Sequence, residues 1–188
     1  MINIYKASLK DTVLISELAK QIYQEHYLHL WNTGGAQWYM DEYAYALDKI
    51  ETELTDANVE YFIAVEDGTY LGYLKIILNS TWAGDETLAA LEVERIYLHK
   101  AAMGKGLGKK LMQVALNKAL QLKKDIVFLK AMDSATSAIE FYKKLGYIIF
   151  GSFELPLPLF SLMKKEYRGM LVLKKEVGNQ ALPILMIF

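Results

Sequence analysis

A loop with three alternating glycines is the part of this sequence whose residue types and spacing most clearly suit chemistry. Gly104, Gly106 and Gly108 follow a strand-like run and open a lysine-rich amphipathic segment that ends near Leu122. Glycine adopts backbone angles closed to other residues and lets main-chain N–H groups approach a ligand. The N-terminus of a helix adds about half a positive charge. A strand, a glycine loop and a helix in this order predict a phosphate-binding turn.

The charges around the loop favour the same interpretation. Four lysines surround the glycines: Lys100, Lys105, Lys109 and Lys110. A turn that needs only flexibility does not require four cations within a Debye length. The loop lacks the GK[ST] ending of a Walker loop. The preceding strand carries Glu92, Glu94 and Arg95, whereas the strand before a dinucleotide fingerprint is nearly continuous in apolar residues.

A second motif lies at 133–147, DSATSAIEFYKKLGY, which predicts a short helix stopped by Gly146. Together the two stretches resemble the GNAT superfamily of N-acetyltransferases, which has a strand, a [QR]xxGx[GA] loop and a helix, followed by a helix like AxxFYxKLGF. The second motif matches at Ala138, Phe141, Tyr142, Lys144, Leu145, Gly146 and Tyr147. The residues of the two motifs most resemble those of bacterial spermidine/spermine acetyltransferase-like members. The specific resemblance covers 91–150.

Two positions depart from the family pattern. Met103 stands where the family usually has Gln or Arg, and Ala135 stands where many members carry Asn. Because the first position contributes mainly its backbone N–H in the family, the site is expected to survive. Asp133 or Ser134 would take over the polar contact of the second.

The resemblance implies an α/β (α+β) fold, with a mixed, mostly antiparallel sheet of six to seven strands and about four flanking helices. One domain is expected over 1–177, followed by an apolar tail at 178–188. Capping and periodicity predict a helix from Asp11 or Thr12 to about His29 and a second helix over 37–53. Strands are predicted at 2–8, 61–66, 70–79, 126–131, 148–155 and 169–174, with a hairpin turn at Asp67 and Gly68.

Composition excludes several classes of protein. The chain has 188 residues, is 53% hydrophobic and contains no cysteine, so a disulfide framework and a catalytic thiol are ruled out. A net charge of −1 gives no general attraction to nucleic acid or to a membrane, and the tail is too short to span a bilayer. His26 and His29 lack a third ligand, so no metal site is predicted. A cytoplasmic location is expected, and the apolar tail would suit a homodimer.

The resemblance further implies direct attack of an amine on the thioester of acetyl-CoA. Only about one primary amine in a thousand is unprotonated at neutral pH, so a base is needed, a role worth about 10² to 10⁴ in rate. Strand alternation is expected to place Glu92 and Glu94 on one face with Ile96 and Leu98. Glu92 is the first candidate for the base and Glu94 the second, although a salt-bridged strand face would also explain both. Tyr142 matches the family tyrosine near the sulfur of the leaving thiol.

The same match assigns the two binding regions. Acetyl-CoA would contact the strand at Ile96, Tyr97 and Leu98, the loop at Met103, Gly104, Lys105, Gly106, Leu107, Gly108 and Lys109, and also Asp133 and Lys144. The acceptor would meet Tyr27, Trp31, Trp38 and Tyr39, with Glu25, Asp41 and Glu42 nearby.

The acceptor itself is left open by the sequence. Aromatic faces and carboxylates suit a cationic amine such as a polyamine. Other small amines, amino acids, aminoglycosides and protein N-termini or lysines remain alternatives. So does a non-catalytic module of the same fold that binds CoA for regulation.

Overall fold

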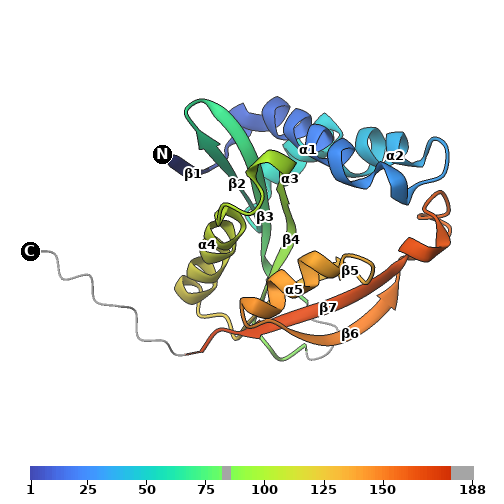
Figure 1. The fold of residues 1–188 in the computed structure, drawn as a ribbon. Coiled ribbons are helices and arrows are strands. Elements are labelled where there is room, and N and C mark those ends of the chain that lie inside the picture. The colour runs from blue at the N-terminus through green and yellow to red at the C-terminus, as the bar shows by residue number, and fades with distance from the viewer. Residues whose placement is uncertain (82–85, 179–188) are drawn as a thin grey trace, which may run out of the picture.

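A seven-stranded sheet runs through the computed structural model, which describes residues 1–81 and 86–178 (Figure 1). The strands are β1 Ile2–Lys6, β2 Val59–Glu66, β3 Thr69–Ser80, β4 Ala90–Leu98, β5 Ile126–Met132, β6 Ile148–Glu154 and β7 Gly169–Glu176. Their order is β1-β2-β3-β4-β5-β7-β6, and only the β4–β5 pair is parallel. The predicted mixed, mostly antiparallel sheet is confirmed.

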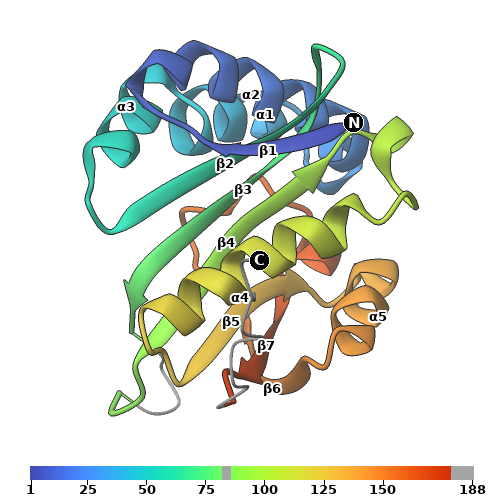
Figure 2. The ribbon, with the colours of Figure 1, turned by 90° about the vertical axis from the view of Figure 1, so that its left-hand side faces the viewer.

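Helices cover both faces of the sheet. One face, over the first strands, carries α1 Thr12–Tyr27, α2 Gly35–Trp38 and α3 Leu47–Thr55. The opposite face carries α4 Leu107–Gln121, which runs along β4, and α5 Thr136–Lys144 (Figure 2). Two apolar clusters fill these layers, one under α1 and α3 and the other under α4 and α5. Within the described ranges, none of the helices has the length and hydrophobicity needed to cross a membrane.

The second predicted helix, over 37–53, is wrong as a single element. The chain forms α2, then a π-helical turn at Tyr39–Ala44, and α3 begins only after a bend at Tyr45 and Ala46. Distant side chains bind the carbonyl groups at the break, because Ser16 Oγ donates to Tyr45 O at 2.6 Å and Arg95 Nη1 donates to Ala44 O at 3.2 Å. Helical periodicity along 37–53 carries no information about such partners.

The hairpin between β2 and β3 forms as predicted. Asp67 and Gly68 have φ of 49° and 79°, the positive values that a tight two-residue hairpin turn requires. The predicted tail lies almost wholly at 179–188, outside the described residues.

A bulge in β4 divides the sheet. Lys75 of β3 pairs with Arg95, but the next residue of β3 pairs with Val93, so Glu94 is the extra residue. Pairing between β4 and β5 covers only Ala90–Val93. Beyond that point β4 stays with β3 while β5 stays with β7. This opening between β4 and β5, here called the split, begins at Glu94.

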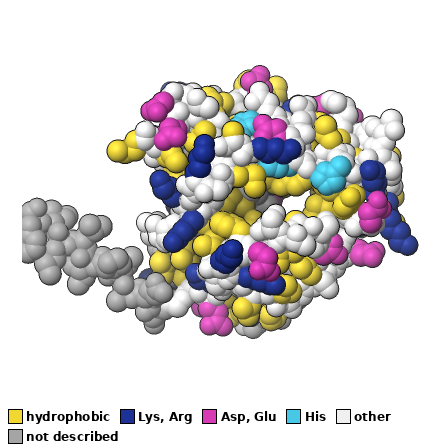
Figure 3. All heavy atoms as spheres, in the orientation of Figure 1, with side chains coloured by type: hydrophobic (Ala, Val, Ile, Leu, Met, Phe, Trp, Pro, Cys, Tyr) yellow, Lys and Arg dark blue, Asp and Glu magenta, His cyan; other side chains and the backbone are white. Residues whose placement is uncertain are grey.

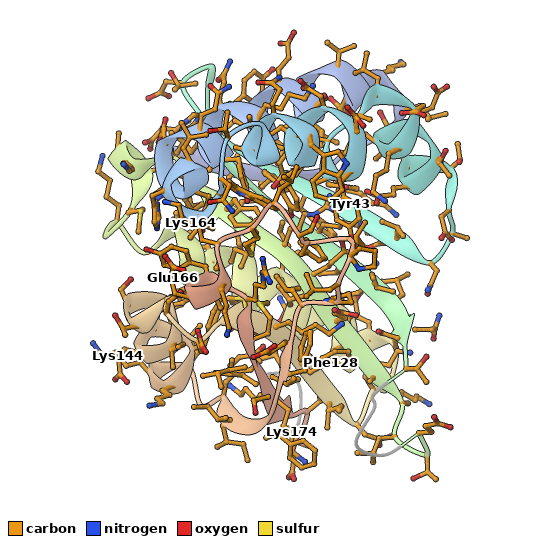
Figure 4. All side chains as sticks on the ribbon, turned by 90° about the vertical axis from the view of Figure 1, so that its right-hand side faces the viewer. Tyr43, Phe128, Lys144, Lys164, Glu166 and Lys174 are labelled. Carbon is orange, nitrogen blue, oxygen red and sulfur yellow. The ribbon has the colours of Figure 1, made fainter. Side chains whose placement is uncertain are left out.

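Residues 155–168, here called the strap, join β6 to β7 and reach the helical layer. Asn32 N donates to Leu162 O at 2.9 Å, and Lys164 N donates to Leu30 O at 2.9 Å. Figure 4 shows Lys164 where the strap meets these helices. The molecular surface is hollowed between the helical layer and the β5–β7 end (Figure 3).

Candidate active site

The glycine loop has the backbone geometry of an anion site. Gly104 and Gly106 have φ of 75° and 78°, which favour glycine. Gly106 is the N-cap of α4, and the first bond of the helix runs from Lys110 N to Gly106 O at 3.2 Å. The N–H groups of 107–109 precede that bond and have no acceptor within the helix. They are free to bind an anion at the positive end of α4.

Gly108 has a different role from the one expected. It lies inside the first turn of α4, and its φ is not positive. A Cβ atom added to Gly108 would lie 3.1 Å from Cζ of Phe141. The absence of a side chain therefore allows α4 to approach α5 closely, and α5 carries Tyr142.

Met103 also differs from the expectation. Its backbone N–H donates to Lys100 O at 3.2 Å, closing the short 3₁₀ turn before the loop, and its side chain is 52% exposed. The amide predicted to meet a phosphate is thus already used. The available N–H groups begin at Gly104.

Lysines gather around α4. Figure 3 shows basic side chains along the left of the face, over this helix. A pocket of about 240 Å³ lies between α4 and α5 and is lined in part by Lys109, Lys144 and Lys175. Lys175 Nζ donates to Leu145 O at 2.7 Å, whereas Lys109 and Lys144 are exposed. Lys109 and Lys144, both predicted to contact acetyl-CoA, therefore lie at the same positively charged pocket.

The split leaves one side of β4 without a neighbouring strand from Glu94 to Leu98, in the part of the chain that the structure describes. Ile96 and Leu98 pack in the apolar cluster under α4 and α5, while Tyr97 packs in the cluster under α1. The carbonyl of Leu98 lies 2.9 Å from His26 Nε2. An extended ligand could lie along this edge of β4 as an added strand.

The predicted common face of the glutamates with Ile96 and Leu98 is wrong, because the bulge shifts the alternation of the strand. Glu92 points away from α4 and is 5% exposed. Lys130 Nζ lies 2.9 Å from its Oε1, and Ser80 Oγ donates to its Oε2 at 2.7 Å. It sits where β4 and β5 are still paired, below the split.

Glu94 lies at the start of the split, with 27% of its side chain exposed. It belongs to a buried ion cluster that contains Glu53, Lys75, Glu94 and Arg95. Lys75 Nζ lies 2.8 Å from Glu53 and 2.7 Å from Glu94, and Arg95 lies 3.2 Å from Glu94. Burial alone would raise the pKa of Glu53, but Lys75 and Arg95 hold it below its ordinary value. The two buried cations balance the two acids, and the more exposed Lys49 also reaches Glu53 at 3.5 Å, so the cluster has no net negative charge.

Tyr142 on α5 is 9% exposed and packs in the same apolar cluster as Ile96 and Leu98 of the free edge of β4. Burial, and secondarily the nearby Tyr27, raise the pKa of Tyr142 well above its usual range, so the phenol stays protonated. Tyr27 comes from α1, and burial raises its pKa to about 12. Tyr27 belongs to the apolar cluster under α1 and Tyr142 to the cluster under α4 and α5, so the two phenols come from opposite faces of the sheet.

The residues predicted to bind the acceptor differ in how deeply they are buried and in what they contact. Tyr27 and Tyr39 are partly exposed. Trp31 is a core residue, 5% exposed, and its Nε1 donates to Tyr23 OH at 2.8 Å. Trp38 stacks on Tyr43 at 5.3 Å between ring centroids and also contacts Phe160 of the strap.

Sequence reasoning missed two contributors to this aromatic region. The ring of Tyr97, expected only to offer backbone groups, contacts Tyr27 at 5.5 Å between ring centroids. Phe160 of the strap packs against Trp31, Trp38 and Tyr43. Nothing in the local sequence around residue 160 indicates this contact, because the strap and the helices are more than a hundred residues apart.

Metal binding is not indicated by the described residues, since they form no group of three or more His, Asp or Glu side chains that could hold an ion. His26 approaches a backbone carbonyl, and His99 Nδ1 lies 2.6 Å from Glu25 Oε1.

Comparisons with known proteins agree with this geometry. Residues 19–147 match the model of the acetyltransferase (GNAT) family. An uncharacterized N-acetyltransferase in the pepI 3′ region of Lactobacillus delbrueckii subsp. lactis is 34% identical over 104 residues, which cover 55% of this chain and 60% of that protein. The match thus spans less than two thirds of that relative.

Solved structures extend the likeness over the whole fold. The PaiA N-acetyltransferase of Thermoplasma acidophilum, solved with coenzyme A, has a TM-score of 0.73 and 17% identity, covering 94% of this chain and 99% of its own. A variant of the spermidine N-acetyltransferase SpeG of Vibrio cholerae has a TM-score of 0.65 and 15% identity, covering 94% of both chains. At these identities the likeness establishes the fold.

Proposed function

Because the chain belongs to the GNAT family of acetyltransferases, we propose that it transfers the acetyl group of acetyl-CoA to a primary amine of a small molecule. The observation that carries this proposal is the split. A glycine loop with positive φ values follows the free edge of β4, and the buried Tyr142 packs in the same apolar cluster as that edge. The split accommodates an extended thioester, and the loop accommodates its phosphates.

Acetyl-CoA would be held by three parts of the chain. The N–H groups from Gly104 to Lys109 suit the pyrophosphate, and the free edge of β4 at Ile96–Leu98 suits the pantetheine arm. Lys109 and Lys144, at the pocket between α4 and α5, suit the remaining phosphate. Asp133 is exposed at the end of β5, where its N–H donates to Gly169 O at 3.0 Å, and it stays a candidate contact.

In the reaction, the amine nitrogen attacks the thioester carbonyl, a C–N bond forms and the C–S bond breaks. The proton lost by the amine needs an acceptor, and the departing thiolate needs a proton. Tyr142 is the proton donor in this proposal, because its buried phenol stays protonated at any working pH. Acetylated amine and CoA thiol are the products.

We assign the base to Glu94 in preference to Glu92. Glu94 opens onto the split, whereas Glu92 lies below it and is engaged by Lys130 and Ser80. The two cations beside Glu94 keep its carboxylate oriented, so transfer through one ordered water fits better than direct contact.

A regulatory module that only binds CoA is the alternative. Such a module needs the loop and the edge of β4 but has no use for a buried tyrosine across the split. The buried phenol of Tyr142, in the same apolar cluster as Ile96 and Leu98 of the free edge of β4, therefore favours the enzyme. A protein N-terminus or lysine is a less suitable acceptor, because the strap connects the two sides of the hollow and restricts access.

Release of thiol from acetyl-CoA, measured with a panel of primary amines, tests the proposal. Turnover should fall by about 10² to 10⁴ in Tyr142→Phe and in Glu94→Gln, with a smaller change in Glu92→Gln. Calorimetry with CoA should give the same affinity for all four proteins. Tight CoA binding without turnover on any amine would support the regulatory module.

A homodimer and a cytoplasmic location stay predictions. The surface that supports pairing with a second copy is β6, an edge strand of sequence IIFGSFE without lysine or proline to protect it. Ile148, Ile149 and Phe150 are largely exposed on it. Light scattering of the native protein and of Ile149→Lys would show whether β6 joins two chains.

A further inference from the structure

The carboxylates expected to attract a cationic acceptor are already engaged. Glu25 Oε1 lies 2.6 Å from His99 Nδ1, and its Oε2 accepts the N–H of Lys100 at 2.8 Å. This backbone bond, together with His99, lowers the pKa of Glu25 and ties the end of α1 to the glycine loop. Asp41 is bound by Lys20 at 2.7 Å and by Gln37. Neither carboxylate is left to bind a ligand cation.

The buried ion cluster likewise offers no net negative charge. Lys75 and Arg95 neutralise Glu53 and Glu94, and both cations are almost fully buried. The Arg95 guanidinium lies 5.3 Å from the ring centroid of Tyr45. A second ammonium group of a ligand in this region would lose its hydration. Its attraction to Glu53 and Glu94 would be offset by repulsion from Lys75 and Arg95.

The side chains packed under α1, on the helical side of the hollow, are aromatic and apolar. Tyr27 contacts Tyr97, and Tyr39 stacks on Tyr23 at 4.7 Å between ring centroids. These four tyrosines stay neutral because burial raises the pKa of each one. Met132, the last residue of β5, packs against the same cluster from the far side of the split.

The remaining carboxylates near the hollow point into water. Glu42, Asp133 and Glu166 are all exposed, and Figure 4 shows Glu166 on the strap below Lys164. An ion pair at such solvent-exposed positions contributes little to binding. A cationic end group among these tyrosines would have ring faces but no free carboxylate to replace its hydration, so an uncharged body suits this region better.

We propose that the acceptor is a compact primary monoamine with an aromatic or aliphatic body, and that linear polyamines are poor substrates. This inference rests on the proposed acetyl transfer. The amino group would be placed at the split beside Glu94 and Tyr142, and the body would lie among Tyr27, Tyr39 and Tyr97. Selectivity then comes from the cost of burying a second ammonium group without a counter-ion.

A matched pair of acceptors tests this. Heptylamine and hexamethylenediamine have the same length and differ in one end group, a methyl in place of an ammonium. In the thiol-release assay, heptylamine and phenethylamine should exceed hexamethylenediamine and spermidine in kcat/KM by about tenfold or more. Diamine turnover equal to or above that of heptylamine would overturn the inference and leave acetyl transfer standing. Release with none of the amines would remove both.

A pair of variants tests the same inference by changing the protein and not the amine. Met132→Glu adds a carboxylate to the wall opposite the tyrosines, and Met132→Gln is its uncharged control. The charged variant should shift the ratio of diamine to monoamine kcat/KM upward by about tenfold, while the control leaves the ratio unchanged. Circular dichroism and CoA affinity establish that both variants are folded. An equal ratio in the two folded variants would contradict the proposal.

Discussion

The two halves of the site are built in different ways. The cofactor half, residues 91–147, offers main-chain N–H groups, a free strand edge and exposed lysines. The acceptor half, residues 12–46 with the strap, offers buried side chains that come from segments distant in sequence. Backbone geometry depends on a few glycines and a helix start, whereas a side-chain wall depends on the whole tertiary structure.

The charges follow the same division. In the cofactor half, the lysines near the glycine loop and at the end of α5 are exposed to an anionic ligand: Lys100, Lys105, Lys109, Lys110 and Lys144. In the acceptor half, Glu25 and Asp41 are held by neighbouring groups, and the ion cluster beneath is internally balanced. Local backbone features, such as a glycine turn and a helix N-terminus, can bind a cofactor that a whole family shares. Binding of a particular acceptor depends instead on which charged side chains of the pocket already have partners.

The largest effect is expected where the ions are buried. Arg95→Met would leave Glu53 and Glu94 with one cation between them, and the free energy of unfolding should fall by about 3–5 kcal/mol. Lys143→Met removes an exposed pair with Glu140 on α5 and should cost less than about 1 kcal/mol. Urea unfolding of both variants makes the comparison. Equal losses would mean that the buried ion cluster contributes no more to stability than the exposed pair.

Two glycine variants, with a smaller expected effect on stability, distinguish backbone strain from loss of CoA binding. Gly106→Ala and Gly34→Ala each place a side chain at positive φ in open space, so each should destabilise the fold by about 1–2 kcal/mol. Only Gly106 belongs to the anion loop, and only its variant should weaken CoA binding, by about tenfold in Kd. Calorimetry alongside urea unfolding measures both quantities. A loss of CoA affinity in Gly34→Ala would show that the halves are coupled.

Acidification should weaken the buried ion cluster through Glu53. Its pKa is lower in the folded than in the unfolded chain, so its stabilising contribution is complete above the unfolded value of 4.5. That contribution is lost as the pH falls from 4.5 through the lower folded pKa. Thermal unfolding across this range should show a shallower pH dependence in Glu53→Gln than in the native protein. Parallel curves would exclude Glu53 as a source of the acid sensitivity.

The smallest effect is expected at the contact between α4 and α5. Gly108→Ala brings a Cβ to 3.1 Å from Phe141, which must shift by a few tenths of an ångström and move α5 with it. We expect a severalfold fall in kcat, because Tyr142 moves, with little change in CoA affinity. Adding Phe141→Leu should restore part of the rate by relieving the contact. A lower CoA affinity with normal kcat would instead place Gly108 in the anion site alone.

The sheet could be predicted almost completely from the sequence, and the helices less well. Strand alternation and the Asp67–Gly68 turn depend on neighbours a few residues away, so they survive without tertiary information. The break before α3 depends on Ser16 and Arg95, which bind carbonyl groups from 29 and 51 residues away. A local pattern contains no trace of such bonds.

Predictions about the site also agreed with the structure where they depended on nearby residues, and failed where they depended on pairing with another strand. The glycine loop was identified from three residues and the helix that follows them, and its positive φ values agree with that interpretation at Gly104 and Gly106. The face of Glu92 was misjudged because one inserted residue, Glu94, reverses the alternation of β4. A bulge is set by pairing with β3, which the sequence of β4 alone does not contain.

The sequence by itself determined the family, the order of strands and helices, and the backbone turn that suits a phosphate, because each depends on short-range propensity and spacing. Tertiary structure alone decided which glutamate lies at the start of the split, which tyrosines pack together under α1 and which carboxylates are already paired. Those outcomes depend on contacts between segments such as α1, β4 and the strap, whose approach is fixed only when the apolar clusters on the two faces of the sheet are packed.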